Sequence, residues 1–408
     1  MHALCQHNIV LIVVDALRPD HLSCYGYRRE TTPEIDRIAQ EGCRFENVIS
    51  QSSWTKPAVA SLLSGTLPEM HGVKSITDVL IETDGYLPRL LKQVGYTTCC
   101  IQTNPFLGRE SGFSQGFDCY RELFENGSGE CKPRVPDVYA AAAEWLECCG
   151  SRPFFLYLHL LDTHNPYTPP DHLPSFGSTE QDRYDGEIRF IDSYIGLLRN
   201  LLIRKGWYEK TLLIITADHG EEFEEHGRRY HAKHLYQEVL RVPLIITAPG
   251  ILTSGVRSSS LTSSIDIVPT ILELACLQPA DTHQGSSVFP ELNGCPVPQR
   301  PALSQIGSGK ESNSIDLVSL ICGEYKLIWN TCSQSSELYN LVLDPLEQHN
   351  LAEHEPAVVE RLLPQIHDLL HQQKEDPVVQ HRKRKEAPRI AVFEKEILQQ
   401  LRGLGYID

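Results

Sequence analysis

Short apolar runs alternate with amphipathic stretches along most of the chain. The runs are rich in β-branched residues, which is typical of buried strands, and they are Ile9–Val14, Thr97–Gln102, Phe154–Leu161, Leu212–Thr216 and Val242–Thr247. Between them, apolar residues recur at helical spacing in Thr32–Glu41, Ile81–Gln93, Val138–Cys148, Tyr184–Lys205 and Ser264–Ala275. This alternation predicts an α/β fold with a mainly parallel central sheet covered by helices on both faces.

The pattern changes after the last of these helices. Pro, Gly and polar residues are frequent from Leu277 to Ala302, which is typical of a linker. Beyond it we expect strands at Ser314–Cys322 and Tyr325–Trp329 and a helix at Pro356–Lys374. We therefore expect a large domain over residues 1–290. A smaller α+β subdomain, with a small antiparallel sheet and a helix, would occupy residues 291–408.

Polar residues that could do chemistry follow four of the predicted strands. They are Asp15, Thr103-Asn104, Asp162-Thr163-His164 and Asp218-His219. In sheets of this kind, ligands bind beyond the carboxyl ends of the strands. The sequence therefore predicts a functional site at that edge of the sheet.

The segment Ser52–Ser61 contains a threonine where a helix is expected to begin. Helical spacing over Pro57–Ser64 is followed by Gly65, a residue type that commonly ends helices. The hydroxyl of Thr55 would then lie among backbone N–H groups that attract anions. One interpretation makes Thr55 a helix N-cap, and another makes it a nucleophile activated by a metal held by Asp15. Both interpretations can hold at once.

Two carboxylates, an imidazole and a hydroxyl could form a mixed oxygen and nitrogen shell for a divalent cation. These groups belong to Asp15, Asp218, His219 and Thr55. The alternative for Asp218-His219-Gly220 is a capped turn after a strand. We favour the metal, because a second pair of carboxylates follows directly and the glycine permits close approach.

Several histidines lie close to these residues in the sequence or follow another strand. His226, His231 and His234 come after the Asp218-His219 pair, and His231 is the preferred candidate among them. His164 precedes Pro166, which favours an irregular active-site loop. For His164 the alternative is a solvent-facing loop histidine.

Composition and charge narrow the class of protein. The 408 residues are enough for a large core, and the balance of 22% charged and 41% apolar residues is that of an ordinary globular protein. The formal net charge of −16 argues against nucleic-acid binding. An anionic substrate would need local positive charge, such as a metal with a few Lys or Arg side chains.

The sequence shows neither a signal peptide nor a stretch long enough for a membrane span. The 13 cysteines are an odd number without a zinc-binding spacing, and Cys99-Cys100 and Cys148-Cys149 are vicinal pairs. We therefore expect reduced cysteines in a cytoplasmic enzyme without membrane insertion. Whether the chain forms a homo-oligomer stays open.

Taken together, the motifs resemble those of the sulfatase family within the alkaline phosphatase superfamily, over nearly the whole chain. The stretches that carry the likeness are Asn8–Asp15, Arg18-Pro19-Asp20, Cys24-Tyr25-Gly26, Thr32–Asp36, Thr55-Lys56-Pro57 through Leu63-Ser64-Gly65, His71-Gly72, His164-Asn165-Pro166, Ala217–Gly220, Leu235–Glu238, Arg241-Val242-Pro243, Glu337–Leu341, Asp344-Pro345, Asn350-Leu351 and Leu404-Gly405-Tyr406.

The resemblance implies an alkaline-phosphatase-like α/β sandwich with a smaller carboxyl-terminal sheet and helix. It also implies a metal held by the residues matching Asp15, Asp218 and His219, next to a nucleophile matching Thr55. A histidine matching His164 would lie near the ester oxygens. A basic residue is expected in the region His231–Lys233.

The chain departs from the sulfatase pattern at the nucleophile. Sulfatases carry Cys-x-Pro-Ser-Arg, or a Ser version, whose first residue becomes formylglycine, whereas this chain has Thr55-Lys56-Pro57-Ala58-Val59. Threonine cannot become formylglycine, and Cys131-Lys-Pro-Arg-Val135 only approaches the motif. Ala16 replaces the second Asp, and Asn104-Pro105-Phe106 replaces a Lys-x-His.

A threonine nucleophile resembles instead the phosphodiesterases, phosphomutases and phospho-group transferases of the superfamily. Those relatives often use two metals, and Asp162, His164 and His231 could hold a second one. We favour one divalent ion (Mn, Zn, Ca or Mg) over two, because the spacing of that trio does not closely match.

We therefore expect a metal-dependent hydrolase of phosphate or phosphonate esters, acting on a small anionic monoester or diester. Thr55 would attack, Lys56, Asn104 or Lys233 would stabilise charge, and His164 or His231 would protonate the leaving alcohol. Two alternatives stay open. One is a sulfuric ester hydrolase, arylsulfatase-like but without formylglycine, and the other is a non-catalytic binding module.

Overall fold

The computed structural model describes residues 7–126, 133–150, 152–307, 316–377, 379–380, 390–391, 393, 397–398 and 401–402. An eight-stranded sheet in the order β10-β2-β9-β6-β1-β5-β3-β4 forms the centre of the fold. Its strands are β1 (Asn8–Val14), β2 (Cys43–Ile49), β3 (Thr97–Gln102), β4 (Cys119–Glu122), β5 (Phe154–Leu160), β6 (Thr211–Ala217), β9 (Arg241–Thr247) and β10 (Val256–Ser263). Strand β9 pairs antiparallel with β2 and β6, and the other neighbours are parallel. The predicted mainly parallel α/β fold is confirmed.

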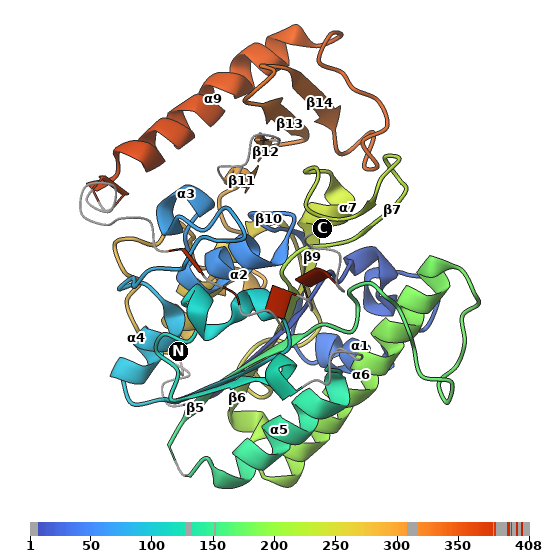
Figure 1. Ribbon diagram of the computed structural model, residues 1–408, viewed down its shortest axis with the longest axis vertical. Helices are drawn as coiled ribbons and strands as arrows, with labels where there is room; N and C mark the ends of the chain where they lie inside the picture. Colours follow the sequence, from blue (N-terminus) through green and yellow to red (C-terminus); the bar gives the residue numbers. More distant parts are fainter. Residues whose placement is uncertain are drawn as a thin grey trace.

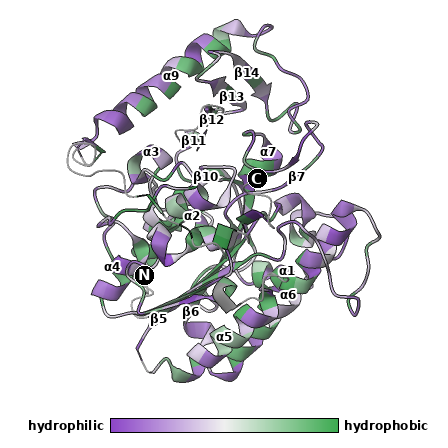
Figure 2. Cartoon of the chain, viewed as in Figure 1, coloured by the Kyte–Doolittle hydropathy of each residue, from purple (hydrophilic) through white to green (hydrophobic). Residues whose placement is uncertain are grey.

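Helices cover the sheet on both sides, with α5 and α6 on one side and α2 and α4 on the other (Figure 1). The apolar sides of α5 and α6 lie toward the sheet and their polar sides toward solvent (Figure 2), whereas every residue of α2 is buried. This arrangement buries the β-branched strands in one large core. The helices are α1 (Pro33–Gln40), α2 (Thr55–Ser64), α3 (Pro68–His71), α4 (Leu87–Gln93), α5 (Val135–Cys148), α6 (Glu180–Arg204), α7 (Gln237–Leu240) and α8 (Ile267–Leu274).

A C-terminal unit of one sheet and one helix follows. Its four strands are antiparallel, and they are β11 (Ala302–Ile306), β12 (Leu317–Cys322), β13 (Tyr325–Asn330) and β14 (Ser336–Asn340). Helix α9 (Pro356–Glu375) packs Leu362 and Ile366 into the same apolar cluster. The predicted small antiparallel sheet with a helix is confirmed, and the division at residue 290 stays a prediction.

The sequence pattern placed several helix boundaries wrongly and missed several strands. Helices α2, α5 and α6 begin before the expected Pro57, Val138 and Tyr184. The helix expected from Ile81 begins only at Leu87, because a turn at Asp84-Gly85 precedes it and Pro88 lies in its first turn. Strands β2, β4, β10, β11 and β14 were not expected. They are short or carry polar residues, as in the Ser-rich β10, so their pairing depends on neighbours distant in the sequence.

The cysteines are not all reduced. Ten described cysteines are free, but Cys276 is disulfide-bonded, so the expectation of reduced thiols is wrong at that position. Cys131 and the motif Leu404-Gly405-Tyr406 lie outside the described residues.

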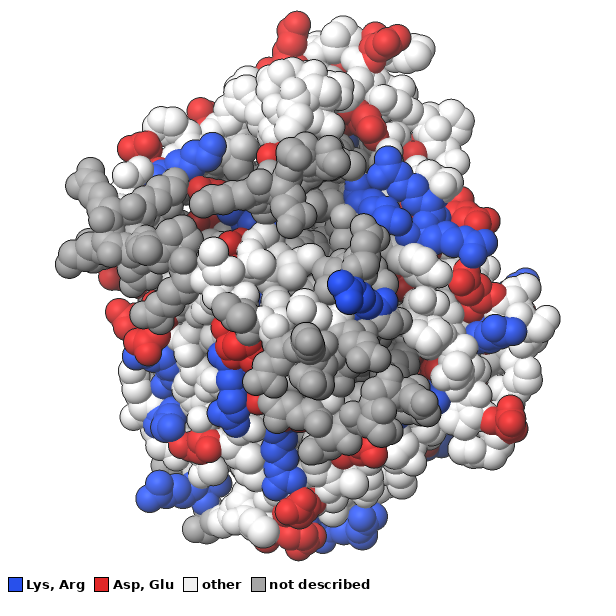
Figure 3. Space-filling model, in the orientation of Figure 1, with Lys and Arg blue, Asp and Glu red and all other residues white. Residues whose placement is uncertain are grey.

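Within the described ranges, no helix has the length and apolar character needed to cross a membrane. On the face drawn in Figure 3, acidic and basic side chains are interspersed, and the largest group of Lys and Arg side chains lies near the position of α7 and β7 in Figure 1.

Candidate active site

The register of two parallel strands brings two aspartates together. Val14 of β1 pairs with Ala217 of β6, and each is followed directly by an aspartate, so Asp15 and Asp218 lie side by side beyond the carboxyl ends of the strands. Both side chains are buried. The α/β topology thus builds the site where the strand pattern predicted it.

The two carboxylates use only part of their hydrogen-bonding capacity. Asp15 Oδ2 accepts hydrogen bonds from Asn104 Nδ2 at 2.9 Å and from Thr55 Oγ1 at 3.2 Å. Asp218 Oδ1 accepts from the backbone N–H groups of Ala16 at 3.2 Å and His219 at 2.9 Å. Asp15 Oδ1 and Asp218 Oδ2 are buried without a hydrogen-bond partner among the described residues. Each of these two oxygens lies 3.6 Å from His219 Nε2.

Charge in this pair is unbalanced unless a cation is present. Burial raises the pKa of Asp218, and the neighbouring charge of Asp15 raises it further. Burial acts the same way on Asp15, but the hydrogen bond from His159 and the charges of nearby histidines hold the pKa of Asp15 below its usual range. Two adjacent buried carboxylates cannot both stay ionised without compensation. Their unpartnered oxygens therefore fit a divalent cation, which favours such ligands.

One further group of this site was missed in the sequence. His159, in β5, places its Nε2 3.2 Å from Asp15 Oδ2, and its ligand atom lies within 4.8 Å of those of Asp15 and Asp218. The hydroxyl of Tyr157 lies 3.1 Å from His159 Nδ1 and holds the imidazole in place. The available signal was a single imidazole inside the apolar run Phe154–Leu160, which reads as an ordinary buried strand.

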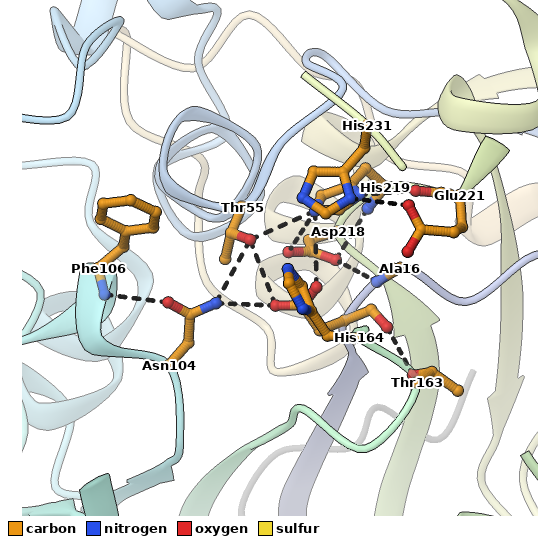
Figure 4. Close-up of polar contacts among 12 residues, drawn as sticks. Ala16, Thr55, Asn104, Phe106, Thr163, His164, Asp218, His219, Glu221 and His231 are labelled. Carbon is orange, nitrogen blue, oxygen red and sulfur yellow. Dashed lines mark hydrogen bonds and ion pairs between the residues drawn. The ribbon is translucent and has the colours of Figure 1, made fainter. Parts of the chain in front are cut away.

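Thr55 is the first residue of α2, and its hydroxyl points into the aspartate pair (Figure 4). Thr55 Oγ1 lies 3.2 Å from Asp15 Oδ2, 3.3 Å from His219 Nε2 and 3.4 Å from Asn104 Nδ2. The N-cap position belongs to Trp54, so the interpretation of Thr55 as the N-cap is wrong. Helix α2 ends at Gly65 in the left-handed conformation (φ 63°), as the sequence predicted.

The side-chain amide of Asn104 has a fixed orientation (Figure 4). Its Oδ1 accepts a hydrogen bond from the backbone N–H of Phe106 at 3.0 Å. Its Nδ2 therefore faces Asp15 and Thr55, where it can donate to an oxyanion at the same place.

A row of three imidazoles lies beside Thr55. The ring centroids of His219 and His231 are 4.4 Å apart, and those of His231 and His164 are 5.0 Å apart. Burial lowers the pKa of His164 to about 4. Burial, followed by the charge of His219, places the pKa of His231 well below its usual value. Both shifts favour the neutral form of the imidazole.

Glu221 orients His231. Its Oε1 lies 2.9 Å from His231 Nδ1, and its Oε2 accepts a hydrogen bond from the Tyr167 hydroxyl at 2.7 Å. Burial raises the pKa of Glu221 to about 7. Glu221 and His231 both belong to residues 221–234, here called the hairpin segment, which contains β7 (Glu222–Phe223) and β8 (Arg229–Tyr230).

The other predicted residues lie elsewhere. Lys56 is fully buried, its Nζ donates to the backbone oxygen of Ile76 at 2.5 Å, and burial lowers its pKa to about 7. Lys233 is exposed on the hairpin segment. The carboxylate of Asp162 accepts from Arg134 Nε at 3.0 Å and from the backbone N–H of Val135 at 2.9 Å. Of the trio proposed for a second metal, the rings of His164 and His231 are neighbours. The carboxylate of Asp162 instead faces the start of α5.

The family model described as Sulfatase matches residues 7–277, and a model for the C-terminal region of N-sulphoglucosamine sulphohydrolase matches residues 224–376. N-acetylgalactosamine-6-sulfatase of Canis lupus familiaris is 25% identical over 399 residues, which cover 83% of this chain and 74% of that protein.

Two solved structures share the fold. One is a protein in complex with its substrate D-glucosamine-2-N,6-O-disulfate, with a TM-score of 0.77, 20% identity, and coverage of 93% of this chain and 100% of that chain. The other is the phosphonate monoester hydrolase of Agrobacterium radiobacter, with a TM-score of 0.76, 20% identity, and coverage of 90% of this chain and 96% of that chain. At such identities the likeness shows the fold alone.

Proposed function

The chain belongs to the sulfatase family, and from that premise we propose that this hydrolase cleaves phosphate or phosphonate esters with Thr55 as its nucleophile and a divalent cation as its cofactor. The observation that carries the proposal is the position of one hydroxyl. Thr55 Oγ1 lies at the start of α2, 3.2 Å from Asp15 Oδ2 and 3.3 Å from His219 Nε2. A hydroxyl that acts as a nucleophile needs a neighbouring carboxylate or imidazole to accept its proton.

The residues that would hold the cation are Asp15, Asp218 and His219 with the Thr55 oxygen, and His159 is a further candidate. When bound, the ion would lower the pKa of a hydroxyl and stabilise negative charge on the ester oxygens. The unpartnered oxygens of Asp15 and Asp218 support this assignment.

The remaining steps use groups of the chain itself. Thr55 Oγ1 attacks phosphorus in line, and the Asn104 amide and the first N–H groups of α2 donate to the equatorial oxygens. His231, oriented by Glu221, or its neighbour His164 takes up the proton that Thr55 loses and then donates it to the leaving alcohol. The same imidazole then takes a proton from the water that releases the phosphoryl group from Thr55.

The chemistry of threonine favours phosphorus over sulfur. A formylglycine hydrate carries a second hydroxyl that can expel sulfate, whereas an ester on Thr55 has no such route. A phosphothreonine can be hydrolysed by water at the same centre. One structural neighbour is named a phosphonate monoester hydrolase, and cleavage of such an ester fits this interpretation of the site.

Sulfate-ester hydrolysis is the second candidate. It is favoured by the sulfatase names of the curated relatives, including one for a sulfated N-acetylgalactosamine. The third candidate, a binding module without turnover, is disfavoured because the nucleophile, both aspartates and the row of histidines adjoin.

A substrate panel separates these candidates. Nitrophenyl sulfate, phosphate monoester, phosphodiester and phosphonate would each be assayed with Mn²⁺, Zn²⁺, Mg²⁺ and Ca²⁺, beside Thr55→Ala as the matched control. We expect turnover of a phosphorus ester and its loss in the variant. Turnover of the sulfate ester alone would favour the second candidate, and no turnover with any metal would favour the third.

Other expectations from the sequence stay proposals. We propose a small anionic ester as the substrate and no nucleic-acid partner, in keeping with the net charge of −16. A cytoplasmic location, a homo-oligomer and charge stabilisation by Lys56 or Lys233 stay predictions.

A further inference from the structure

Lys326 and Glu347 form an ion pair inside the protein, although neither side chain reaches solvent. Lys326 Nζ, on β13, lies 2.7 Å from Glu347 Oε1, and the exposed fraction of both side chains is 0%. Lysine and glutamate are almost never fully buried unless they are paired, because removing two charges from water is costly. Such a pair requires an explanation beyond stability.

Residues 7–277, which match the family model, are here called the catalytic part. Glu347 contacts this part with two further groups. Its Oε2 accepts a hydrogen bond from the backbone N–H of Gln237, the first residue of α7, at 2.6 Å. Its backbone oxygen accepts from His226 Nε2 at 3.1 Å. Figure 1 shows the loop after β14 running beside α7 and β7. One residue of the C-terminal unit thus holds two elements that lie far from it in the sequence.

The turn that presents Glu347 is built from polar side chains. Asp344 Oδ2 accepts from the backbone N–H of His349 at 2.8 Å, and Asn350 Oδ1 accepts from that of Leu338 at 3.0 Å. Glu347 itself has a φ of 55°, a left-handed conformation that is unfavourable for a residue with a Cβ. The Asp344-Pro345 and Asn350-Leu351 motifs therefore frame a strained residue whose side chain and carbonyl both point at the catalytic part.

From His226 the contacts continue to the active site. His226 Nδ1 lies 2.7 Å from Glu238 Oε1 on α7, and its backbone N–H donates to Glu222 Oε1 at 2.9 Å. Glu222 directly follows Glu221, which orients His231. At the far end of the hairpin segment, the N–H of Ala232 donates to the backbone oxygen of Ser53, two residues before Thr55, at 2.9 Å.

We propose that Glu347 is a positioning residue of the active site, which fixes α7 and the hairpin segment so that Glu221 and His231 face Thr55. The inference deepens the proposed function and rests on it for its kinetic consequence. Its structural consequence, a rigid hairpin segment, does not depend on which ester is cleaved.

Two paired variants isolate the contact from the buried charge. Lys326→Met/Glu347→Gln removes both charges but keeps a side-chain oxygen that can accept from Gln237 N–H. Lys326→Met/Glu347→Leu also removes both charges, but it lacks that acceptor. Replacing a buried ion pair by uncharged residues is often tolerated, so both proteins should fold.

A third variant reaches the same contact from the other side. Gln237→Pro deletes the N–H that Glu347 accepts and leaves the ion pair intact. Proline is tolerated at the first position of a helix, and Tyr236 before it already has the extended conformation (φ −76°, ψ 169°) that precedes proline. Glu355→Ala is the matched control, because Glu355 accepts from Tyr325 on the same C-terminal unit but has no part in this chain of contacts.

The kinetic test compares kcat with KM on the best ester of the panel. We expect Lys326→Met/Glu347→Leu and Gln237→Pro to lower kcat about 10-fold or more, with KM within about twofold, because small displacements of catalytic groups cost rate steeply. Lys326→Met/Glu347→Gln and Glu355→Ala should keep kcat near that of the wild type. Equal kcat values in the Gln and Leu pairs, with Gln237→Pro unchanged, would overturn the proposal.

Hydrogen exchange of peptides covering residues 222–234 supplies the readout that is independent of turnover. We expect faster exchange in the Leu pair and in Gln237→Pro, and unchanged exchange in the Gln pair and in Glu355→Ala. If the wild type cleaves no ester, the proposed function fails and exchange alone decides this inference. Unchanged exchange in all variants would contradict it.

Discussion

At the scale of single residues, the site is defined by which atoms lack a partner. Asp218 Oδ2 and Asp15 Oδ1 are buried acceptors without a hydrogen bond in the described part of the chain, whereas Asp162 has its carboxylate occupied by Arg134 and Val135. This contrast distinguishes the aspartates that we propose as metal ligands from a structural one, although both kinds follow a strand in the sequence.

A pair of variants tests that contrast. Asp218→Asn should reduce the bound divalent metal about 10-fold or more, because it removes one anionic ligand of a buried cation. Asp162→Asn should keep the metal content of the wild type, since its neighbours are a guanidinium and a backbone N–H. Elemental analysis after dialysis measures both. Equal metal loss in the two variants would favour a second ion involving Asp162.

The sequence indicated several residues of the candidate site, but it missed another. Asp15, Thr55, Asp218 and His219 could be found because each follows a strand or begins a helix. His159 could not, because it lies inside an apolar strand and its role appears only when β1 and β5 pair in register at Val13 and His159. The N-cap interpretation of Thr55 was wrong by one residue, a normal uncertainty of helix boundaries.

At the scale of elements, close backbone contact holds the strand ends in place. Gly220 directly follows the Asp218-His219 pair, and a Cβ added to it would lie 2.0 Å from the backbone oxygen of Glu238 in α7. Any side chain there would push α7 and the end of β6 apart. The glycine therefore lets α7 approach Asp218 and His219, the proposed metal ligands.

Gly220→Ala should lower stability by about 1–3 kcal/mol, as overpacking commonly does, and should also lower kcat. Gly42→Ala is the matched control, because its Cβ would lie 2.3 Å from the backbone oxygen of Ile246 at a distance from the site. Thermal unfolding and kcat would be measured for both. The account is contradicted if Gly220→Ala changes kcat no more than Gly42→Ala does.

The hairpin segment should respond to pH through His226. Burial opposes its charge, but the hydrogen bond and charge of Glu238 outweigh burial and raise the pKa of His226 from 6.5 to about 9. The folded protein thus binds more protons than the unfolded chain between these values. The contribution of His226 to stability is fully present below pH 6.5 and is lost as the pH rises through about 9.

The denaturant concentration at the unfolding midpoint should therefore decrease as the pH rises from 6.5 to 9. It should decrease less in His226→Gln, whose side chain cannot titrate. Denaturant unfolding at several pH values would measure the difference between the two proteins. Parallel curves for His226→Gln and the wild type would show that His226 is not the responsible group.

Elements with their own strong pattern could be predicted, and elements defined by partners could not. Strands β1, β3, β5, β6 and β9 were found because each is an apolar run. Strand β10 was not, since its Ser-rich sequence becomes a strand only by pairing with β2. The hairpin segment has strands of two residues each, which no periodicity can indicate.

At the scale of the whole molecule, the C-terminal unit contacts the catalytic part through shared apolar clusters and through the polar contacts of Glu347. Glu347 links β13 to α7 and to the hairpin segment. The sequence motifs after β14 resemble family features. The contacts that they make could not be predicted, because Glu347 and Gln237 lie far apart in the sequence. Family membership and fold class thus followed from the sequence, while the contacts of Glu347 could be seen only in the structure.

The central claim is that the hydroxyl of Thr55 attacks the ester and carries the transferred group. Rapid quenching during turnover of the best phosphorus ester, followed by mass spectrometry of the peptide that contains Thr55, tests it directly. The account predicts one phosphoryl group on Thr55, and Thr55→Ala should stay folded, lack the adduct and lose about 10³-fold or more in kcat. Turnover without an adduct at Thr55, together with most of the activity retained in Thr55→Ala, would contradict it.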